Sequence, residues 1–514
     1  MMTTRRVALR DSRVWEAVGL LAMVAVFLCD VGKDVPQLDD AYISYRYAAN
    51  LVAGKGLVFN AGEYVEGYTN LLWTLLVALL LRLGGEAPRI GLWLNAVSGA
   101  LSLLAVHGFA RSLLPPGRLA WALIAPLVLL ASTSFAAWTT GGMETPLFLV
   151  LTVSACWAAS LGRRWLAAVL CMLTTLTRPE GALLAACLLL HAPQRPRPGS
   201  RQFLNTQAPA LVFGAFMAAT TLWRLWYYGD LVPNTFHAKV GEAPWQGGLL
   251  YFVRFLLSGA ILLVPPAAVA AWRLPALRPG LLFCVLNTIY DVSIGGDFFP
   301  QSRFFLAPFA LLAVATSARA GTRVGGLVAG AAATGSILWS LFLVWPNLPV
   351  GFVPLSAALA SPPRFASWQQ GSLTSNRAEA EQHYFPFPED PFIKSQLAHF
   401  AQMSPPARVV AATGIGRLGY FGMDLRIVDL VGLVDKHIAR SPRLVAGATL
   451  LPGHSRTDAP YVLSQLPDAI IIDRKGAVGF IHWPAMMDLW AQPELERDYV
   501  FDEGAKAYLR RGGK

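Results

Sequence analysis

The sequence predicts a polytopic α-helical membrane protein with a small α/β domain at its C-terminal end. Of its 514 residues, 55% are hydrophobic and only 14% are charged, which is far from the composition of soluble globular domains. The apolar residues are gathered in blocks, several of which reach the roughly 20 residues that cross a bilayer. After residue 345 the blocks stop, and the segment from residue 351 onward contains 17 basic and 16 acidic residues, so it is nearly neutral. These observations predict about eleven crossing helices followed by a water-exposed segment.

The apolar blocks predict the helices in chain order. Trp15–Cys29 follows a basic stretch but has no small-residue cleavage site, so we expect a retained anchor rather than a signal peptide. The later blocks cover residues 71–83, 90–109, 119–135, 146–161, 165–176, 182–190, 208–226, 249–272, 281–289, 304–315 and 324–345. The shorter blocks predict half-helices or helices that are extended by polar and aromatic flanks. Together the blocks define a membrane domain over residues 1–345.

The net charge of +11 is explained by where the basic residues lie. They gather in short connections between apolar blocks, at Arg163, 195–201, 273–278 and 319–323, whereas acids gather in 30–66, 230–242 and 291–297. The positive-inside rule then puts the basic connections in the cytoplasm, and the acidic ones and the C-terminal domain outside. The side of the connections between residues 84 and 144 stays open. We expect a multi-pass protein of the cytoplasmic (inner) membrane that contacts membrane lipid and no nucleic acid.

The C-terminal part divides into a connecting segment, 346–406, and a small α/β domain, 407–514. Runs at 408–413, 426–430 and 468–473 predict strands. Gly414–Gly419 reads GIGRLG after the first strand, as in dinucleotide-binding proteins. Six residues then separate it from the next strand, too few for the helix that would hold a pyrophosphate. A tight-turn glycine cluster is favoured over a nucleotide site.

An adjacent acid pair, Asp39-Asp40, opens the first outer loop, residues 30–67. Two neighbouring carboxylates at a membrane surface cost desolvation and mutual repulsion, so their presence indicates a task. Ala41–Val52 behind them has helical spacing and predicts an amphipathic helix that lies on the membrane surface. The alternative is that the pair only caps this helix.

The loop also carries a recognisable pattern. Residues 39–73 read DDAYISYRYAANLVAGKGLVFNAGEYVEGYTNLLW, and further motifs are GMETPL (142–147), TRPEG (177–181), YYGDLVPNT (227–235), GGDFFPQSRF (295–304) and DLVGLVDKHIA (429–439). With them, most of the chain resembles the mycobacterial terminal β-arabinofuranosyltransferase family and its largely uncharacterised bacterial relatives, within the GT-C superfamily. The resemblance implies an inverting glycosyltransferase that moves a sugar, with arabinofuranose as one candidate, from a polyprenyl-phosphate donor to a cell-envelope glycan acceptor on the outer face.

Besides a non-catalytic membrane scaffold, which would leave the acid pair unexplained, two other functions stay open at this point. One is a glycan ligase or polymerase that uses a polyprenyl-pyrophosphate donor. The other is a non-enzymatic flippase or transporter of lipid-linked sugars, although the acids crowd into loops rather than into mid-helix positions.

By the resemblance, Asp39 is the general base with Asp40 beside it, because an acceptor hydroxyl needs a base as it attacks. Which of the two acids takes the proton stays open. The departing phosphate calls for cations near the outer boundary, and the alternative for each cation is a side chain that snorkels from a helix end. The candidate phosphate ligands are Arg178, Arg303, Lys239 and Arg46. The candidate substrate contacts are Glu144, Glu66, Tyr68, Asn70, Asn234 and Asp297.

No cofactor is predicted. The histidines lack the spacing of a zinc site. A divalent metal held by Asp39, Asp40 and Asp297 stays an open alternative.

Overall fold

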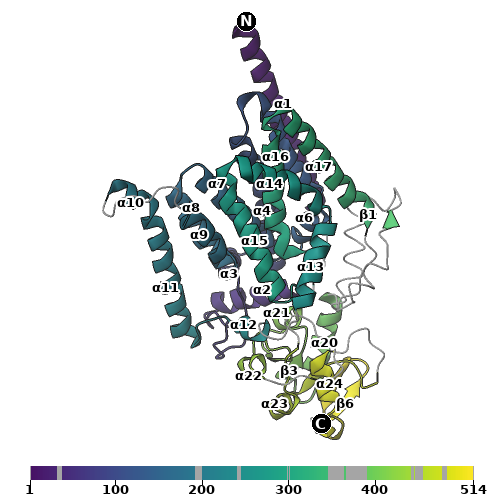
Figure 1. Ribbon diagram of the computed structural model, residues 1–514. Helices are drawn as coiled ribbons and strands as arrows, with labels where there is room; N and C mark the ends of the chain where they lie inside the picture. The colour runs from purple at the N-terminus through teal and green to yellow at the C-terminus, as the bar shows by residue number, and fades with distance from the viewer. Residues whose placement is uncertain are drawn as a thin grey trace.

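The computed structural model describes residues 2–31, 37–191, 200–239, 245–297, 299, 301–344, 364–365, 390–441, 445, 455–476 and 483–512. Within them, a helical bundle carries a small sheet domain at one end, and the N-terminal helix projects from the other end (Figure 1). The molecule is therefore mostly helical with a C-terminal sheet, as the sequence predicts.

The predicted apolar blocks form the helices of the bundle. These are α1 (Met2–Val31), α3 (Leu71–Arg82), α4 (Ala87–Ser112), η1 (Pro116–Leu123), α5 (Ile124–Leu130), α6 (Thr133–Trp138), α7 (Thr145–Ser160), α8 (Arg164–Thr177), α9 (Gly181–Leu189), α11 (Ala208–Tyr228), α13 (Trp245–Leu257), α14 (Val264–Arg273), α15 (Arg278–Ser293), α16 (Leu306–Ala318) and α17 (Arg323–Phe342). Short helices η2 (Ala260–Leu263), η3 (Pro275–Leu277), η4 (Arg303–Phe305), η5 (Arg319–Gly321) and α10 (Arg201–Thr206) join them. The block 249–272 is broken into two helices that meet at 71°.

Several of these helices are apolar and long enough to cross a membrane. Among the described residues there are four, or five if the bent pair is one span. Shorter apolar helices, such as Thr145–Ser160 and Arg164–Thr177, complete the bundle. The count of about eleven crossings stays a prediction.

Helix α2 (Asp39–Val52) lies between the bundle and the C-terminal domain (Figure 1). It packs against α3 on one side and α21 (Gly416–Phe421) on the other, and most of its side chains are buried. This differs from the expected helix on the membrane surface. The physical reason is that its polar face binds another part of the protein, and an amphipathic pattern does not tell a protein surface from lipid headgroups.

The C-terminal domain holds a five-stranded sheet in the order β4-β3-β5-β7-β6. The strands are β3 (Val409–Ala412), β4 (Arg426–Asp429), β5 (Ala469–Ile471), β6 (Tyr499–Asp502) and β7 (Ala507–Arg510). The first three in chain order are parallel to one another, and β7 and β6 are antiparallel. The helices around the sheet are α20 (Asp390–Gln402), α21, α22 (Lys436–Ala439), α23 (Ala459–Ser464), α24 (Pro484–Trp490) and α25 (Pro493–Asp498). All three predicted strands are confirmed. A separate two-residue pair joins β1 (Leu343–Val344) and β2 (Arg364–Phe365).

A shared apolar core joins the C-terminal domain to the first outer loop. Tyr47 and Phe59 of that loop are buried together with Val410, Leu418 and Ile427 of the domain. Burial of such side chains contributes roughly 1.5–3 kcal/mol each, so the two parts form one packed unit at this end of the bundle.

Candidate active site

Charged side chains from separate segments gather where the bundle, the connections between its helices and the C-terminal domain adjoin. They form what we call the charged cluster, whose members are Asp40, Glu144, Arg178, Glu180, Lys239, Asp291, Asp297 and Arg303. Desolvated charges are costly unless they are paired or needed for chemistry. This concentration of charge at the end of an apolar bundle therefore marks the candidate active site.

Arg178 is the most heavily paired member of the cluster. Its Nη2 lies 2.6 Å from Oε1 of Glu180, and its Nη1 lies 3.3 Å from Oε1 of Glu144. The guanidinium carbon also lies 4.4 Å from the centroid of the Phe304 ring. Local sequence explains this position, because Pro179 disfavours a helical residue before it. Arg178 is accordingly extended, and α8 ends one residue earlier.

A chain of hydrogen bonds ties Glu144 to helix α2. Asn70 Nδ2 donates to Oε2 of Glu144 at 2.9 Å and to Oγ of Ser44 at 3.0 Å. Ser44 lies four residues after Asp40 and hence on the same face of α2. Two predicted substrate contacts, Glu144 and Asn70, are thereby brought together, with Asn70 orienting the carboxylate.

Arg303 and Asp297 form a two-contact ion pair. The distances are 2.5 Å from Nε to Oδ2 and 3.1 Å from Nη2 to Oδ1. The guanidinium lies among the rings of Phe299, Phe304 and Trp138, at 4.7, 5.0 and 5.3 Å from their centroids. A planar cation held in this way keeps one orientation.

Asp40 and Lys239 are the cluster members whose polar ends are least engaged. Among the described residues, neither the carboxylate nor the ammonium makes a side-chain hydrogen bond, and both residues are half-buried. Burial raises the pKa of Asp40 to about 6, although Arg303 and Lys239 oppose the shift. Burial, followed by the nearby charge of Arg303, lowers the pKa of Lys239. An acid poised near neutral pH beside cations is suited to proton transfer.

Asp39 points elsewhere, toward the C-terminal domain. Its Oδ2 accepts a hydrogen bond from the backbone N–H of Gly416 at 2.9 Å, and its Oδ1 accepts one from that of Arg417 at 2.8 Å. A Cβ at residue 416 would come within 1.8 Å of the backbone oxygen of Asp39. The GIGRLG motif therefore begins α21 and needs glycine for close approach, and the anion at this helix start is a side chain of the same protein.

Arg46 and Asn234, expected to contact substrate, also bind the C-terminal domain. Arg46 is 1% exposed and donates to the carbonyls of Phe59, Gly419 and Leu425 at 2.7, 2.6 and 2.6 Å. Asn234 Nδ2 donates to the carbonyls of residues 432 and 433 at 2.8 and 3.0 Å. With these donors directed at backbone oxygens, the structure gives both residues a role in holding the domain in place.

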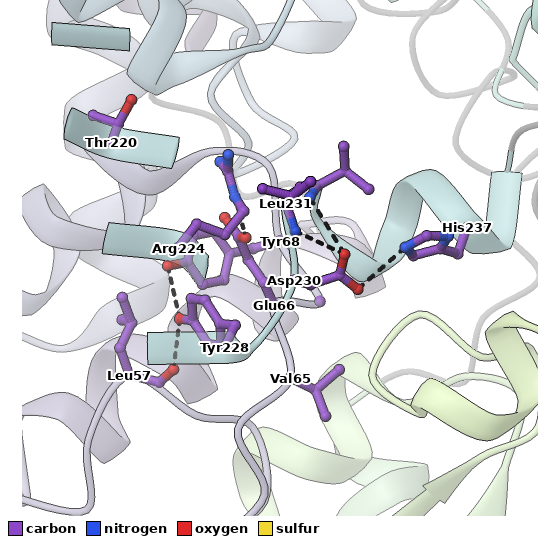
Figure 2. Close-up of polar contacts among 12 residues, drawn as sticks. Leu57, Val65, Glu66, Tyr68, Thr220, Arg224, Tyr228, Asp230, Leu231 and His237 are labelled. Atoms are coloured by element: carbon purple, nitrogen blue, oxygen red, sulfur yellow. Dashed lines mark hydrogen bonds and ion pairs between the residues drawn. The ribbon is translucent and has the colours of Figure 1, made fainter. Parts of the chain in front are cut away.

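Glu66 and Tyr68 lie beside α11, where they contact Arg224 and Tyr228 (Figure 2). Glu66 Oε2 is 2.5 Å from Nε of Arg224 on α11, and burial raises the pKa of Glu66 against the effect of Arg224. The Tyr68 hydroxyl lies 3.0 Å from that of Tyr228, which donates to the carbonyl of Leu57 at 2.8 Å. These contacts fasten the outer loop to the end of α11.

Sequence reasoning missed two members of the cluster. Glu180 follows Arg178 by two residues in a motif already singled out, so its pairing with the arginine was a readable signal. Asp291 is fully buried in α15, where its Oδ2 accepts a hydrogen bond from Asn287 at 2.6 Å. An acid inside an apolar helix is rare and marks a functional region.

Metal binding was left open by the sequence. In the described part of the chain, no group of three or more His, Cys, Asp or Glu side chains is placed to hold a metal ion. Asp39, one of the three candidate ligands, directs both carboxylate oxygens at backbone N–H groups.

Two solved structures resemble this fold in part. The archaeal oligosaccharyltransferase AglB from Archaeoglobus fulgidus, in complex with an inhibitory peptide and a dolichol-phosphate, has a TM-score of 0.48 at 12% identity, covering 81% of this chain and 64% of that one. ArnT from Cupriavidus metallidurans, bound to undecaprenyl phosphate, has a TM-score of 0.48 at 11% identity, covering 82% and 86%. Residues 380–508 match the model of a domain of unknown function, DUF8728.

Two curated relatives carry the same name, terminal β-(1→2)-arabinofuranosyltransferase. The protein of Corynebacterium glutamicum is 30% identical over an alignment of 335 residues, and the match covers 53% of this chain and 46% of the relative. That of Mycobacterium tuberculosis is 31% identical over an alignment of 327 residues, and the match covers 54% of this chain and 51% of the relative. The chain thus spans about half the length of the curated relatives it matches. The resemblance to terminal β-arabinofuranosyltransferases that the motifs indicated is confirmed, and both relatives are named as glycosyltransferases.

Proposed function

We propose that the protein is an inverting glycosyltransferase that moves a sugar from a polyprenyl-phosphate donor to a glycan acceptor. The observation that carries the proposal is the state of Asp40. Its carboxylate has no hydrogen-bonding side chain among the described residues, burial raises its pKa to about 6, and the charges of Arg303 and Lys239 oppose that shift. The names of the two curated relatives favour arabinofuranose as the sugar.

Asp40 serves as the general base in this proposal. The acceptor O–H attacks the anomeric carbon of the donor, and its proton passes to the Asp40 carboxylate. The bond from the anomeric carbon to the phosphate oxygen breaks, and polyprenyl phosphate departs with the electron pair. A single attack from the face opposite the phosphate inverts the configuration. General-base catalysis of this kind contributes about 10²–10⁴-fold to the rate.

Arg303 and Lys239 bind the donor phosphate. Arg303 offers a planar guanidinium in a fixed orientation. Lys239 offers an ammonium that makes no side-chain hydrogen bond among the described residues. Arg178 lies behind them and is balanced by Glu144 and Glu180. Its positive charge adds to the local field, while the two glutamates keep it in place.

The C-terminal domain, by its position over the acid-rich loops, provides the surface for the acceptor glycan. Asp39, Arg46 and Asn234 tie it to those loops. The membrane around the bundle delivers the lipid-linked donor. The reaction then takes place on the outer face of the cytoplasmic membrane, where the acid-rich loops are expected.

A transfer assay at varied pH tests the proposed function. The full-length protein in nanodiscs is supplied with a polyprenyl-phosphate-linked arabinofuranose and an arabino-oligosaccharide, and elongated product is measured. Below pH 6 Asp40 takes up a proton, so kcat/KM should fall roughly tenfold per pH unit there and level off above it. A rate independent of pH between roughly 5 and 8 would contradict the role of Asp40. Turnover of a pyrophosphate-linked donor alone would favour the ligase instead.

The proposed location is tested by reporter fusions. Fusions after Arg163 and Arg273 should report the cytoplasm, and fusions after Glu63 and Lys475 should report the outer side, because basic connections are retained inside. A cytoplasmic signal at both Glu63 and Lys475 would invert the orientation and remove the outer-face assignment. A signal on opposite sides would contradict the contact between Glu63 and Arg426, which are 2.5 Å apart.

A further inference from the structure

Two residues directly before Arg303 have an unusual backbone conformation. Gln301 has φ 64° and Ser302 has φ 45°, both in the left-handed region, and neither is glycine. L side chains rarely adopt this region, and they persist there only when the surroundings hold them. The same connection uses glycine at residues 295 and 296, whose φ values are 85° and 77°. The chain therefore uses glycine for one turn and strained residues for the turn that carries the cation.

The short helix α6 holds the strained turn from the side. Ser134 Oγ and Trp138 Nε1 both donate hydrogen bonds to the carbonyl of Gln301, the second at 3.1 Å. Thr133 Oγ1 is hydrogen-bonded to the Gln301 side-chain oxygen at 3.0 Å. Two residues of one helix thus hold the carbonyl of Gln301, and a third holds its side chain. Backbone strain persists only where the surroundings fix the residue in this way.

Trp138 links this support to the guanidinium itself. Its ring centroid lies 5.3 Å from the guanidinium carbon of Arg303, and the ring packs edge-on against Phe299. On another side, Arg303 Nη1 lies 3.3 Å from the sulfur of Met143. The backbone before Arg303 and the faces of its guanidinium are therefore both held, and Asp297 contacts Nε and Nη2. The protein thus fixes the direction of the N–H groups that are left for a ligand before any ligand binds.

We propose that α6 and the turn Gln301–Ser302 form a mount that orients Arg303 for the donor phosphate, with Trp138, Ser134 and Ser302 as positioning residues. The inference rests on the proposed function, in which Arg303 contacts that phosphate. Pre-organisation of this kind lowers the cost of ordering a long side chain on binding. The strained backbone is then part of the binding machinery rather than an incidental loop conformation.

Variants of Ser302 test the mount without touching the cation. Asn tolerates the left-handed region, whereas the β-branched Val does not. In the full-length protein in nanodiscs, binding of undecaprenyl phosphate is followed by phosphorus NMR. Ser302→Val should weaken binding by about 10-fold or more, the loss expected when a charge-assisted hydrogen bond is misaligned. The separate variant Ser302→Asn should bind undecaprenyl phosphate with nearly the affinity of the unchanged protein.

A milder variant guards against misfolding. Trp138→Phe keeps an aromatic ring beside Arg303 but removes the N–H that donates to Gln301. It should weaken binding of undecaprenyl phosphate several-fold with little change in Tm. Unchanged affinity in both Ser302→Val and Trp138→Phe would overturn the mount.

Arg303→Gln, made together with Asp297→Asn so that no buried carboxylate is left unbalanced, separates the two proposals. If this variant binds undecaprenyl phosphate as tightly as the unchanged protein, the phosphate role of Arg303 fails, and the mount fails with it. If this double variant weakens binding while Ser302→Val and Trp138→Phe do not, only the mount is wrong. A lower Tm in these last two variants with unchanged affinity would mean that the turn serves folding alone.

Discussion

Asp40→Asn is expected to lower the rate of sugar transfer by about 10²–10⁴-fold, because an amide cannot take a proton. Folding should not suffer. Burial already raises the pKa of Asp40, so loss of its charge removes a desolvation cost, and Tm should stay the same or rise. The measurements are the transfer rate, the binding of undecaprenyl phosphate and the Tm of the same purified samples.

Asp39→Asn is the matched control, since it makes the same chemical change one residue earlier. An amide offers one acceptor where the carboxylate offers two, so its NH₂ would face the backbone N–H of Gly416 or Arg417. The contact between α2 and α21 should weaken by about 1–3 kcal/mol. We expect a lower Tm, faster proteolysis of the C-terminal domain and a smaller loss of rate. An Asp40→Asn protein that transfers sugar at the original rate would end the assignment of Asp40 as the base, and the same substitution at Asp39 would then be the one to examine for chemistry.

Arg178→Gln is expected to destabilise the fold by about 3–5 kcal/mol, because Glu144 and Glu180 would be left as buried, unbalanced charges. Both ion pairs, Arg178 with Glu144 and Arg178 with Glu180, are nearly inaccessible to water. The measurement is the Tm and the yield of folded protein in detergent. Expression is expected to fall before any effect on transfer can be compared.

Adding Glu180→Gln tests whether the stability lost in Arg178→Gln can be recovered. If Arg178 acts through its ion pairs, the double variant Arg178→Gln, Glu180→Gln should recover part of the lost stability, and the coupling between the two changes can be read from a double-mutant cycle. If Arg178 instead contacts the phosphate directly, the single variant should fold normally and bind undecaprenyl phosphate more weakly. Normal folding with normal binding would leave Arg178 without either role.

Most of the fold was readable from local patterns. Helices follow the apolar blocks because a backbone in lipid must satisfy its hydrogen bonds within the segment. The three strands follow short β-type runs, and 426–430 became β4 within one residue. The position of α2 was not readable, because its polar face binds α21, which lies more than 360 residues away in the chain.

Most residues of the candidate site could be predicted from the sequence, but their spatial arrangement could not. The sequence pointed to Asp40, Glu144, Arg178 and Arg303, all of which belong to the charged cluster. It also pointed to Arg46, whose guanidinium is directed at carbonyls of the C-terminal domain. An arginine that binds phosphate and one that binds backbone oxygens use the same donors, so the residue type does not separate them.

By itself, the sequence predicted a helical membrane protein with a C-terminal α/β domain, and it singled out the acid pair Asp39-Asp40 as a candidate for chemistry. Only the tertiary structure shows which of the two carboxylates is held by backbone N–H groups and which makes no side-chain hydrogen bond among the described residues. Successive residues of a helix point about 100° apart, so Asp39 and Asp40 face different surroundings. Asp39 accepts hydrogen bonds from a helix start 377 residues away, whereas Asp40 lies near enough to Arg303 and Lys239 for their charges to act on it. No local pattern records those partners, because they come from distant segments that only folding brings together.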